Sequence, residues 1–169
     1  MRNRHPADWE NLLAGATPEG VQFLNFKSDR LKPLIGKTLA EVARQRGTSP
    51  EDTVIDLVIE DGSRVEVAYF LMDEANLRRQ VALPWMSFNS DEAAPSIEGV
   101  FLKSSNHPRA FGNFARLLAR YVRDEKLVTL QDAIRRLSAL PAEVLSLDDR
   151  GRLKPGYIAD VVVFDPQLI

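Results

Sequence analysis

The sequence predicts an α/β fold, and three observations in one stretch of chain carry that prediction. Residues 64–71 alternate between polar and apolar side chains and are rich in Val, Tyr and Phe, which is typical of a strand. Residues 73–82 read as a helix that Asp73 caps, and residues 86–89 as a second strand. Such a strand-helix-strand unit joins two neighbouring parallel strands, so the carboxyl ends of both strands lie at one edge of the sheet. Asp91 follows the second strand and is the first candidate catalytic group.

The preceding segment predicts one strand and two helices. Residues 21–24 follow a turn and are a strand candidate. Thr38 opens a helix through a capping box and Gly47 ends it, and Ser49 caps a second helix that has Pro at its first position and ends before Gly62. The apolar side of this second helix is expected to comprise Val54, Ile55, Leu57 and Val58.

The last third of the chain predicts two amphipathic helices and an isolated strand. Apolar residues recur at helical spacing after residue 109, and Thr129 caps a further helix. Residues 159–164 form a β-branched run with no obvious partner strand nearby. An unpaired apolar strand favours self-association. The apolar positions of the two helices are Phe114, Leu117, Leu118, Tyr121 and Val122, then Ala133, Ile134, Leu137 and Leu140.

Composition excludes several classes of function. The 169 residues are 44% hydrophobic and 27% charged, with a formal net charge of -2, so no basic excess attracts nucleic acid or an anionic membrane. No apolar stretch is long enough to span a bilayer, and the cytoplasm is the expected location. Cysteine is absent and the two histidines, His5 and His107, are far apart, so a complete zinc site within this chain is not expected.

Residues from about Gly36 to Pro166 resemble the C-terminal part of the D-aminoacylase group (N-acyl-D-amino-acid deacylases) of the amidohydrolase superfamily. Several short segments carry the resemblance together and in order. They are Gly36-Lys37-Thr38-Leu39-Ala40-Glu41-Val42-Ala43, Ser90-Asp91, His107-Pro108-Arg109-Ala110-Phe111-Gly112, Arg120-Tyr121-Val122-Arg123, Leu140-Pro141-Ala142-Glu143 and the closing stretch from Arg150 to Pro166.

The resemblance implies part of a metal-dependent (β/α)8 TIM barrel with a small β-sandwich domain. Residues 1–145 would be the C-terminal part of the barrel with its trailing helices, and residues 146–169 a segment of the sandwich. The strand candidates at 64–71 and 86–89 would be the last two barrel strands, and 159–164 a sandwich strand. The N-terminal part of the barrel, with the ligands for zinc, is not in this chain, which is therefore expected to be inactive alone.

The resemblance also assigns roles to individual residues. Asp91 would be the acid/base of hydrolysis, taking a proton from a metal-activated water and passing it to the leaving amine; the alternative is a turn aspartate. Arg109 would bind the substrate carboxylate with its planar fork, or bond loop carbonyls. His107 belongs to the same substrate-binding loop and is expected to fix it by a hydrogen bond. Glu92 departs from the family, which often has a small residue there, and Trp85 is expected in the core.

Two functions of different class follow from these residues. The first is a part of an enzyme that hydrolyses the amide bond of N-acyl-D-amino acids. The second is a non-catalytic binding or assembly module that keeps the amidohydrolase fold. Asp91 and Arg109 favour the first, and the lack of metal ligands in the chain favours the second for the isolated polypeptide.

Overall fold

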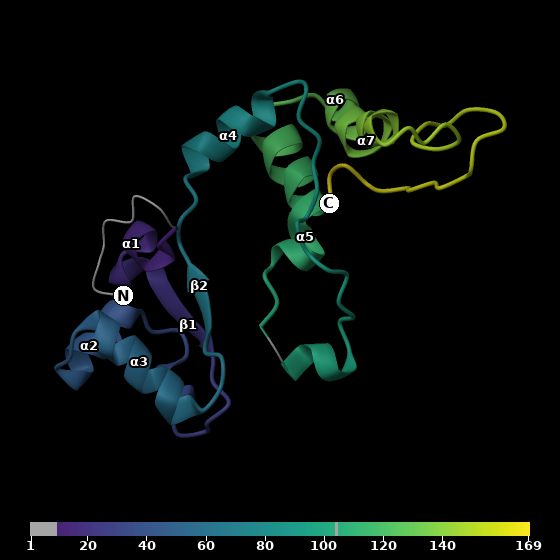
Figure 1. Ribbon diagram of the computed structural model, residues 1–169. Coiled ribbons are helices and arrows are strands. Elements are labelled where there is room, and N and C mark those ends of the chain that lie inside the picture. The colour runs from purple at the N-terminus through teal and green to yellow at the C-terminus, as the bar shows by residue number, and fades with distance from the viewer. Residues whose placement is uncertain (1–9, 104) are drawn as a thin grey trace. The chain divides into compact units, whose positions relative to one another are not determined.

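A computed structural model describes residues 10–103 and 105–169, and His5 lies outside the described residues. The chain divides into two compact units. The first comprises residues 1–72 and 98–105, and the second residues 73–97 and 106–169. In Figure 1 the first unit contains the sheet together with α1, α2 and α3. The regular secondary structure of the described residues of the second unit is helical. The boundary predicted at residue 145, between the barrel part and the sandwich segment, is not tested by these two units and stays a prediction.

The first unit is built around a two-stranded antiparallel sheet. β1 (Val21–Asn25) pairs with β2 (Glu66–Tyr69), and Val21 lies opposite Tyr69. Both strands were predicted, but the partner of β2 is β1 in antiparallel register, not the segment at 86–89. The helices of this unit are α1 (Leu12–Ala16), α2 (Leu39–Arg46) and α3 (Pro50–Asp61), with short 3-10 helices at Pro18–Gly20, Lys32–Leu34 and Gly99–Lys103.

The two long helices of this unit begin and end where the sequence predicts. The Thr38 hydroxyl accepts the Glu41 N–H while the Glu41 carboxylate accepts the Thr38 N–H, which completes the capping box of α2. Ser49 accepts the Asp52 N–H at the start of α3. Gly47 and Gly62 have φ of 68° and 62°, a left-handed conformation that ends a helix at little cost for glycine.

The core of the first unit lies between the sheet and these helices. Phe23 and Phe26 pack as a tilted pair with ring centroids 5.3 Å apart. Leu57 is the buried apolar residue of α3, whereas Ile55 and Val58 are about half exposed, so the predicted apolar side of α3 is only partly covered. The buried apolar residues of this core are Ala16, Val21, Phe23, Phe26, Leu31, Leu39, Val42 and Leu57.

The second unit is helical. α4 (Glu74–Ala82) begins with Asp73 accepting the Asn76 N–H, as predicted. α5 (Arg109–Arg116) continues into a π-helical segment, Leu117–Asp124. α6 (Leu130–Ile134), capped by Thr129 as predicted, continues through a second π-helical segment, Arg135–Ala139, into α7 (Leu140–Val144). The core here comprises Val81, Leu117 and Tyr121, with Leu77, Phe88, Leu127, Val128 and Leu137 packed around them.

Two predicted strands are not strands in the structure. Residues 86–89 belong to no sheet, and their backbone groups bond side chains: the Met86 carbonyl accepts from Arg136, and the Asn89 carbonyl accepts from Asn113. Residues 159–164 are likewise outside any sheet, and Val162 and Val163 are exposed. A strand requires a neighbouring strand for its backbone N–H and C=O groups, and local sequence pattern does not supply one.

None of the helices in the described ranges is both long and apolar enough to cross a membrane.

Candidate functional site

The segment that leads to Asp91 is held by a buried arginine. Arg136 is fully buried, and its Nε donates to the Met86 carbonyl at 2.6 Å while its Nη1 donates to the Val81 carbonyl at 2.7 Å. The guanidinium carbon lies 4.2 Å from the centroid of the Phe88 ring, a cation–π contact. Asp132, one helical turn before Arg136, contributes an ion pair at 3.2 Å. Arg136 therefore fixes residues 81–88 against the helix that begins after Thr129.

Sequence reasoning missed Arg136, although a signal existed. Ala133, Arg136, Leu137 and Leu140 recur at helical spacing, so the helix period places Arg136 on the same side as apolar residues. An arginine on the apolar side of a helix has to find buried acceptors. The pairing with Asp132 at the i, i+4 spacing could also have been expected.

Asp91 lies in a strained loop directly after the anchored segment. Its φ is 48°, in the left-handed region that non-glycine residues seldom adopt and that Asp tolerates better than most. The Asn89 side-chain oxygen accepts the Asp91 N–H at 2.8 Å, and Asn113 of α5 donates to the Asn89 carbonyl at 2.8 Å. The Asp91 carboxylate is directed outward in this loop, where it is 85% exposed.

Arg109 faces two carboxylates of this loop. Its Nη2 lies 3.2 Å from Asp91 Oδ2, and its Nε lies 3.5 Å from Glu92 Oε2, an ion-pair contact without hydrogen-bond geometry. The Glu92 carboxylate is 25% exposed, and its other oxygen accepts the Ala93 N–H at 3.2 Å. The structure therefore brings together Asp91 and Arg109, and it adds Glu92 as a contact that the sequence did not predict.

His107 is hydrogen-bonded at the start of α5, whereas Trp85 is exposed to solvent. The His107 Nδ1 accepts the Arg109 N–H at 3.0 Å, a bond at the first residue of α5. Trp85 is 70% exposed, so its predicted place in the core is wrong. The reason is local: Pro84 and Trp85 form a turn whose carbonyl at Pro84 bonds Arg135, and that turn carries the indole away from the apolar cluster.

No metal site forms within the described part of the chain. Across residues 10–103 and 105–169, three or more His, Cys, Asp or Glu side chains do not gather where they could hold an ion. The Nδ1 of His107 already accepts a backbone N–H. The described residues therefore do not fit a metal centre, and the chemistry derived from them involves carboxylate and guanidinium groups.

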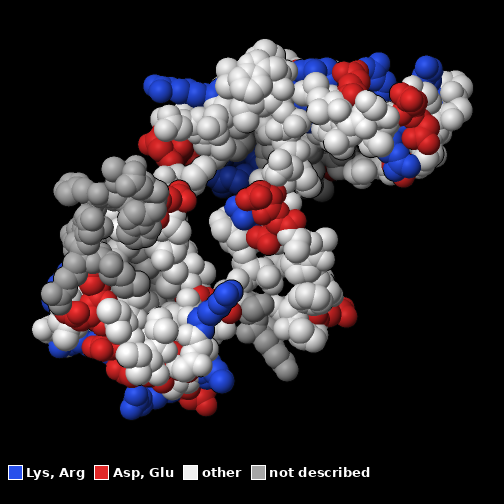
Figure 2. Space-filling model, viewed as in Figure 1, with Lys and Arg blue, Asp and Glu red and all other residues white. Residues whose placement is uncertain are grey.

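An ion network ties α4 to the π-helical segment of the same unit. Glu125 accepts from Arg78 at 2.9 Å and from Arg120 at 2.8 Å, and these hydrogen bonds lower the pKa of Glu125 to about 2. The Tyr121 hydroxyl donates to Glu74 at 2.8 Å, and burial together with that bond raises the pKa of Tyr121. Acidic and basic side chains are interspersed on the face of the protein in Figure 2, in agreement with the small net charge.

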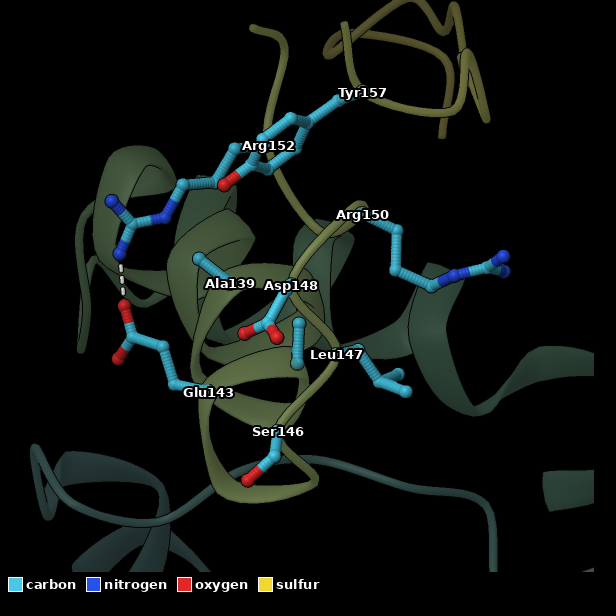
Figure 3. Close-up of a pocket in the computed structure, with 9 residues that line it drawn as sticks. Ala139, Glu143, Ser146, Leu147, Asp148, Arg150, Arg152 and Tyr157 are labelled. Atoms are coloured by element: carbon cyan, nitrogen blue, oxygen red, sulfur yellow. Dashed lines mark hydrogen bonds and ion pairs between the residues drawn. The ribbon is translucent and has the colours of Figure 1, made fainter.

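A cavity of about 310 Å³ lies between α7 and the segment that follows it. Figure 3 shows Glu143 and Arg152 facing each other in an ion pair, with Arg150 pointing away from them. Gly151 approaches the helix so closely that a Cβ there would lie 2.6 Å from the Ala142 Cβ, and its φ is 83°. None of the three predicted site residues lines this cavity; its lining residues are Ala139, Ala142, Glu143, Ser146, Leu147, Asp148, Arg150, Arg152 and Tyr157.

The residues of this site lie in a segment that matches a known protein family. The model of the Amidohydrolase family matches residues 86–169, which include Asp91, Glu92 and Arg109. Residues 86–169 are therefore similar to the amidohydrolase family. Over 134 residues, the chain is 38% identical to an N-acyl-D-glutamate deacylase of Alcaligenes xylosoxydans xylosoxydans, covering 79% of this chain and 25% of that protein. It is 37% identical to a D-aminoacylase of the same organism, covering 80% and 26%.

Solved structures of amidohydrolases agree with the sequence matches. The N-acyl-D-glutamate deacylase of Bordetella bronchiseptica, solved with zinc and a phosphonate that mimics the tetrahedral intermediate, superposes with a TM-score of 0.69 at 33% identity, over 92% of this chain and 30% of that one. A D-aminoacylase structure gives a TM-score of 0.66 at 33% identity, over 86% and 28%. The predicted resemblance to the D-aminoacylase group is confirmed, and the chain spans about a quarter of the length of the curated relatives it matches.

Proposed function

We propose that this chain supplies the part of a zinc-dependent amidohydrolase that positions the acid/base and binds the substrate carboxylate, in an enzyme that releases D-amino acids from N-acyl-D-amino acids. The observation that carries the proposal is the pairing of Asp91 with Arg109 in a loop that Arg136 and Asn113 hold in place. The similarity to two deacylases over some four fifths of the chain supports it.

The proposed chemistry assigns one task to each of three residues. The exposed Asp91 carboxylate can accept a proton and deliver it to the leaving amine nitrogen. Arg109 carries donors in a fixed fork, which suits the α-carboxylate that every N-acyl amino acid presents. His107 positions Arg109 through the bond to its backbone N–H and is not assigned contact with substrate. The metal that polarises the acyl carbonyl would be bound elsewhere in the enzyme, because the described residues of this chain form no site for it.

The proposal extends to the architecture. We propose that the chain contributes the C-terminal part of a (β/α)8 barrel, and that residues 146–169 belong to a small β-sandwich domain. In this arrangement the exposed run at 161–163 would pair with a sandwich strand. Until so paired, the run favours self-association.

A chimera tests the proposed function. In it, this chain replaces the homologous quarter of the Alcaligenes D-aminoacylase, and release of free amine from N-acetyl-D-methionine is measured with zinc present. We expect hydrolysis by the chimera, and a turnover reduced about a hundredfold to ten-thousandfold in Asp91→Asn, the range typical of acid/base groups. The matched control is Asp56→Asn, which changes an exposed carboxylate of α3 and is expected to leave turnover within about twofold, as for a surface change.

Two outcomes of this experiment would contradict the proposal. The first is a chimera that is folded and loaded with zinc but hydrolyses no N-acyl-D-amino acid; this outcome would favour the non-catalytic module. The second is an Asp91→Asn variant as active as its parent, which would leave Asp91 as a turn residue. The chain purified alone is expected neither to retain zinc after dialysis nor to release amine, since its described residues hold no cluster of metal ligands.

A further inference from the structure

The feature from which this inference starts is Glu92, whose carboxylate contacts Arg109. Glu92 Oε2 lies 3.5 Å from Arg109 Nε, and Glu92 Oε1 accepts the Ala93 N–H. The Asp91 carboxylate, which contacts the Nη2 of the same guanidinium, is far more exposed, at 85% against 25% for Glu92. Of the two carboxylates at Arg109, that of Asp91 is therefore the more accessible to exchange with a ligand, and that of Glu92 is the more shielded from solvent.

The charges around this guanidinium limit what can bind there. Arg109 contributes one positive charge and the two carboxylates contribute two negative charges, so the cluster as a whole is negative. One carboxylate of a ligand can replace Asp91 at Nη2 while Glu92 stays at Nε. A second carboxylate on the same ligand would meet Glu92 with Arg109 already neutralised. Two neighbouring carboxylates repel each other, and the partial burial of Glu92 strengthens that repulsion.

We propose that Glu92 determines the substrate class of this site, so that it accepts N-acyl-D-amino acids with uncharged or cationic side chains and rejects those with acidic side chains. The inference rests on the proposed function and makes it more specific. It separates this chain from two relatives to which it is similar, the N-acyl-D-glutamate deacylase and the N-acyl-D-aspartate deacylase, which is 33% identical.

Binding to the full chain tests the inference without requiring catalysis. The chain is labelled with ¹⁵N at arginine, and the Nε–H resonance of Arg109 is assigned by its loss in Arg109→Lys. N-acetyl-D-methionine and N-acetyl-D-glutamate are then titrated separately against the wild type, Glu92→Gln and Glu92→Asp. Glu92→Asp keeps the charge and shortens the side chain, so it is the matched control. Circular dichroism verifies that each variant is folded.

The expected result is a charge-dependent preference. The wild type should bind N-acetyl-D-methionine about tenfold more tightly than N-acetyl-D-glutamate, which corresponds to one repulsive pair of partly screened charges. Glu92→Gln should bind the two probes with nearly equal affinity, mainly through tighter binding of the glutamate derivative. Glu92→Asp should keep most of the preference.

Three results would overturn the inference: equal affinity of the wild type for both probes, the same preference in Glu92→Gln as in the wild type, or no response of the Arg109 resonance to either probe. The same probes as substrates of the chimera separate this inference from the proposed function. Hydrolysis of both at rates that Glu92→Gln does not alter would refute the role of Glu92 and leave the deacylase function standing. Absence of any hydrolysis, with the binding preference present, would refute the function and leave the role of Glu92.

Discussion

Arg136 and Arg109 lie in the same compact unit, yet they differ in burial and in the groups that their guanidinium ions contact. Arg136 is fully buried and donates to two backbone carbonyls, with Asp132 as its counter-ion. Arg109 is 40% exposed and its guanidinium faces carboxylates of a neighbouring loop. A guanidinium bound to backbone carbonyls holds the chain in one conformation, whereas a guanidinium bound to side-chain carboxylates can exchange them for those of a ligand. The first is a structural charge, and the second is the binding group that we propose.

The largest expected effect comes from Arg136→Met. Removal of this buried guanidinium leaves the Val81 and Met86 carbonyls without this donor and takes a counter-ion from Asp132, so we expect a loss of about 3–5 kcal/mol in the free energy of unfolding. Urea denaturation followed by circular dichroism measures it. Arg109→Met is the matched control and should cost less than about 1 kcal/mol, as for an exposed ion pair. Equal losses of unfolding free energy in the two variants would contradict the distinction between a structural Arg136 and an Arg109 that contributes little to stability.

A kinetic effect of intermediate size is expected from Arg109→Lys in the chimera. A point charge replaces the planar fork, so the apparent KM for N-acetyl-D-methionine should rise about tenfold while kcat falls less. Steady-state kinetics measures both constants. A fall in kcat with KM unchanged would show instead that Arg109 acts in the transition state. Stability close to the wild type is expected from the same variant, because an ammonium group at this position would still face Asp91 and Glu92.

The smallest effect concerns pH and the network at Glu125. Its pKa in the folded protein is lowered from 4.5 to about 2 by hydrogen bonds from Arg78 and Arg120. A group with a lowered folded pKa stabilises the protein above its ordinary pKa and loses that contribution as the pH falls. Stability should therefore decline from about pH 4.5 toward pH 2, and Glu125→Gln should flatten the decline, which thermal unfolding between pH 7 and 2 can follow.

The control for this pH series is Asp56→Asn, which removes one exposed carboxylate from α3 in the other unit. It changes the net charge as Glu125→Gln does, and it leaves the bonds from Arg78 and Arg120 in place. We expect its decline with acid to match that of the wild type. A decline in Glu125→Gln as steep as that of the wild type would assign the acid sensitivity to other carboxylates.

Local features of the fold could be predicted from sequence, and non-local ones could not. The caps of α2, α3, α4 and α6 depend on residues three positions apart, and all four were predicted correctly. The pairing of β2 with β1 joins residues more than forty positions apart, a relation that residue pattern does not encode. The segments 86–89 and 159–164 have strand composition without a strand partner in the structure. Composition indicates only that a segment can adopt a strand conformation, and a sheet also requires a partner strand.

The candidate site shows the same limit. Asp91 and Arg109 were selected by residue type and family resemblance, and their proximity is a result of the structure. The contact of Glu92 with Arg109 depends on how a loop folds over seventeen residues, so sequence reasoning recorded Glu92 only as a departure. Arg136 was overlooked because an arginine is ordinarily a surface residue. Its place on the apolar side of a helix was the sign that it is buried.

The contact between Arg136 and Phe88 also makes the loop observable. With the guanidinium carbon 4.2 Å from the ring centroid, the aromatic ring current should displace the Arg136 side-chain proton resonances upfield. Burial should also slow the exchange of its Nε proton with water. Phe88 precedes Asp91 by three residues, so a shift of this resonance toward the values of free arginine would report that the segment carrying the proposed acid/base has left its place. A single side-chain signal thus gives a solution measure of how often the site is assembled.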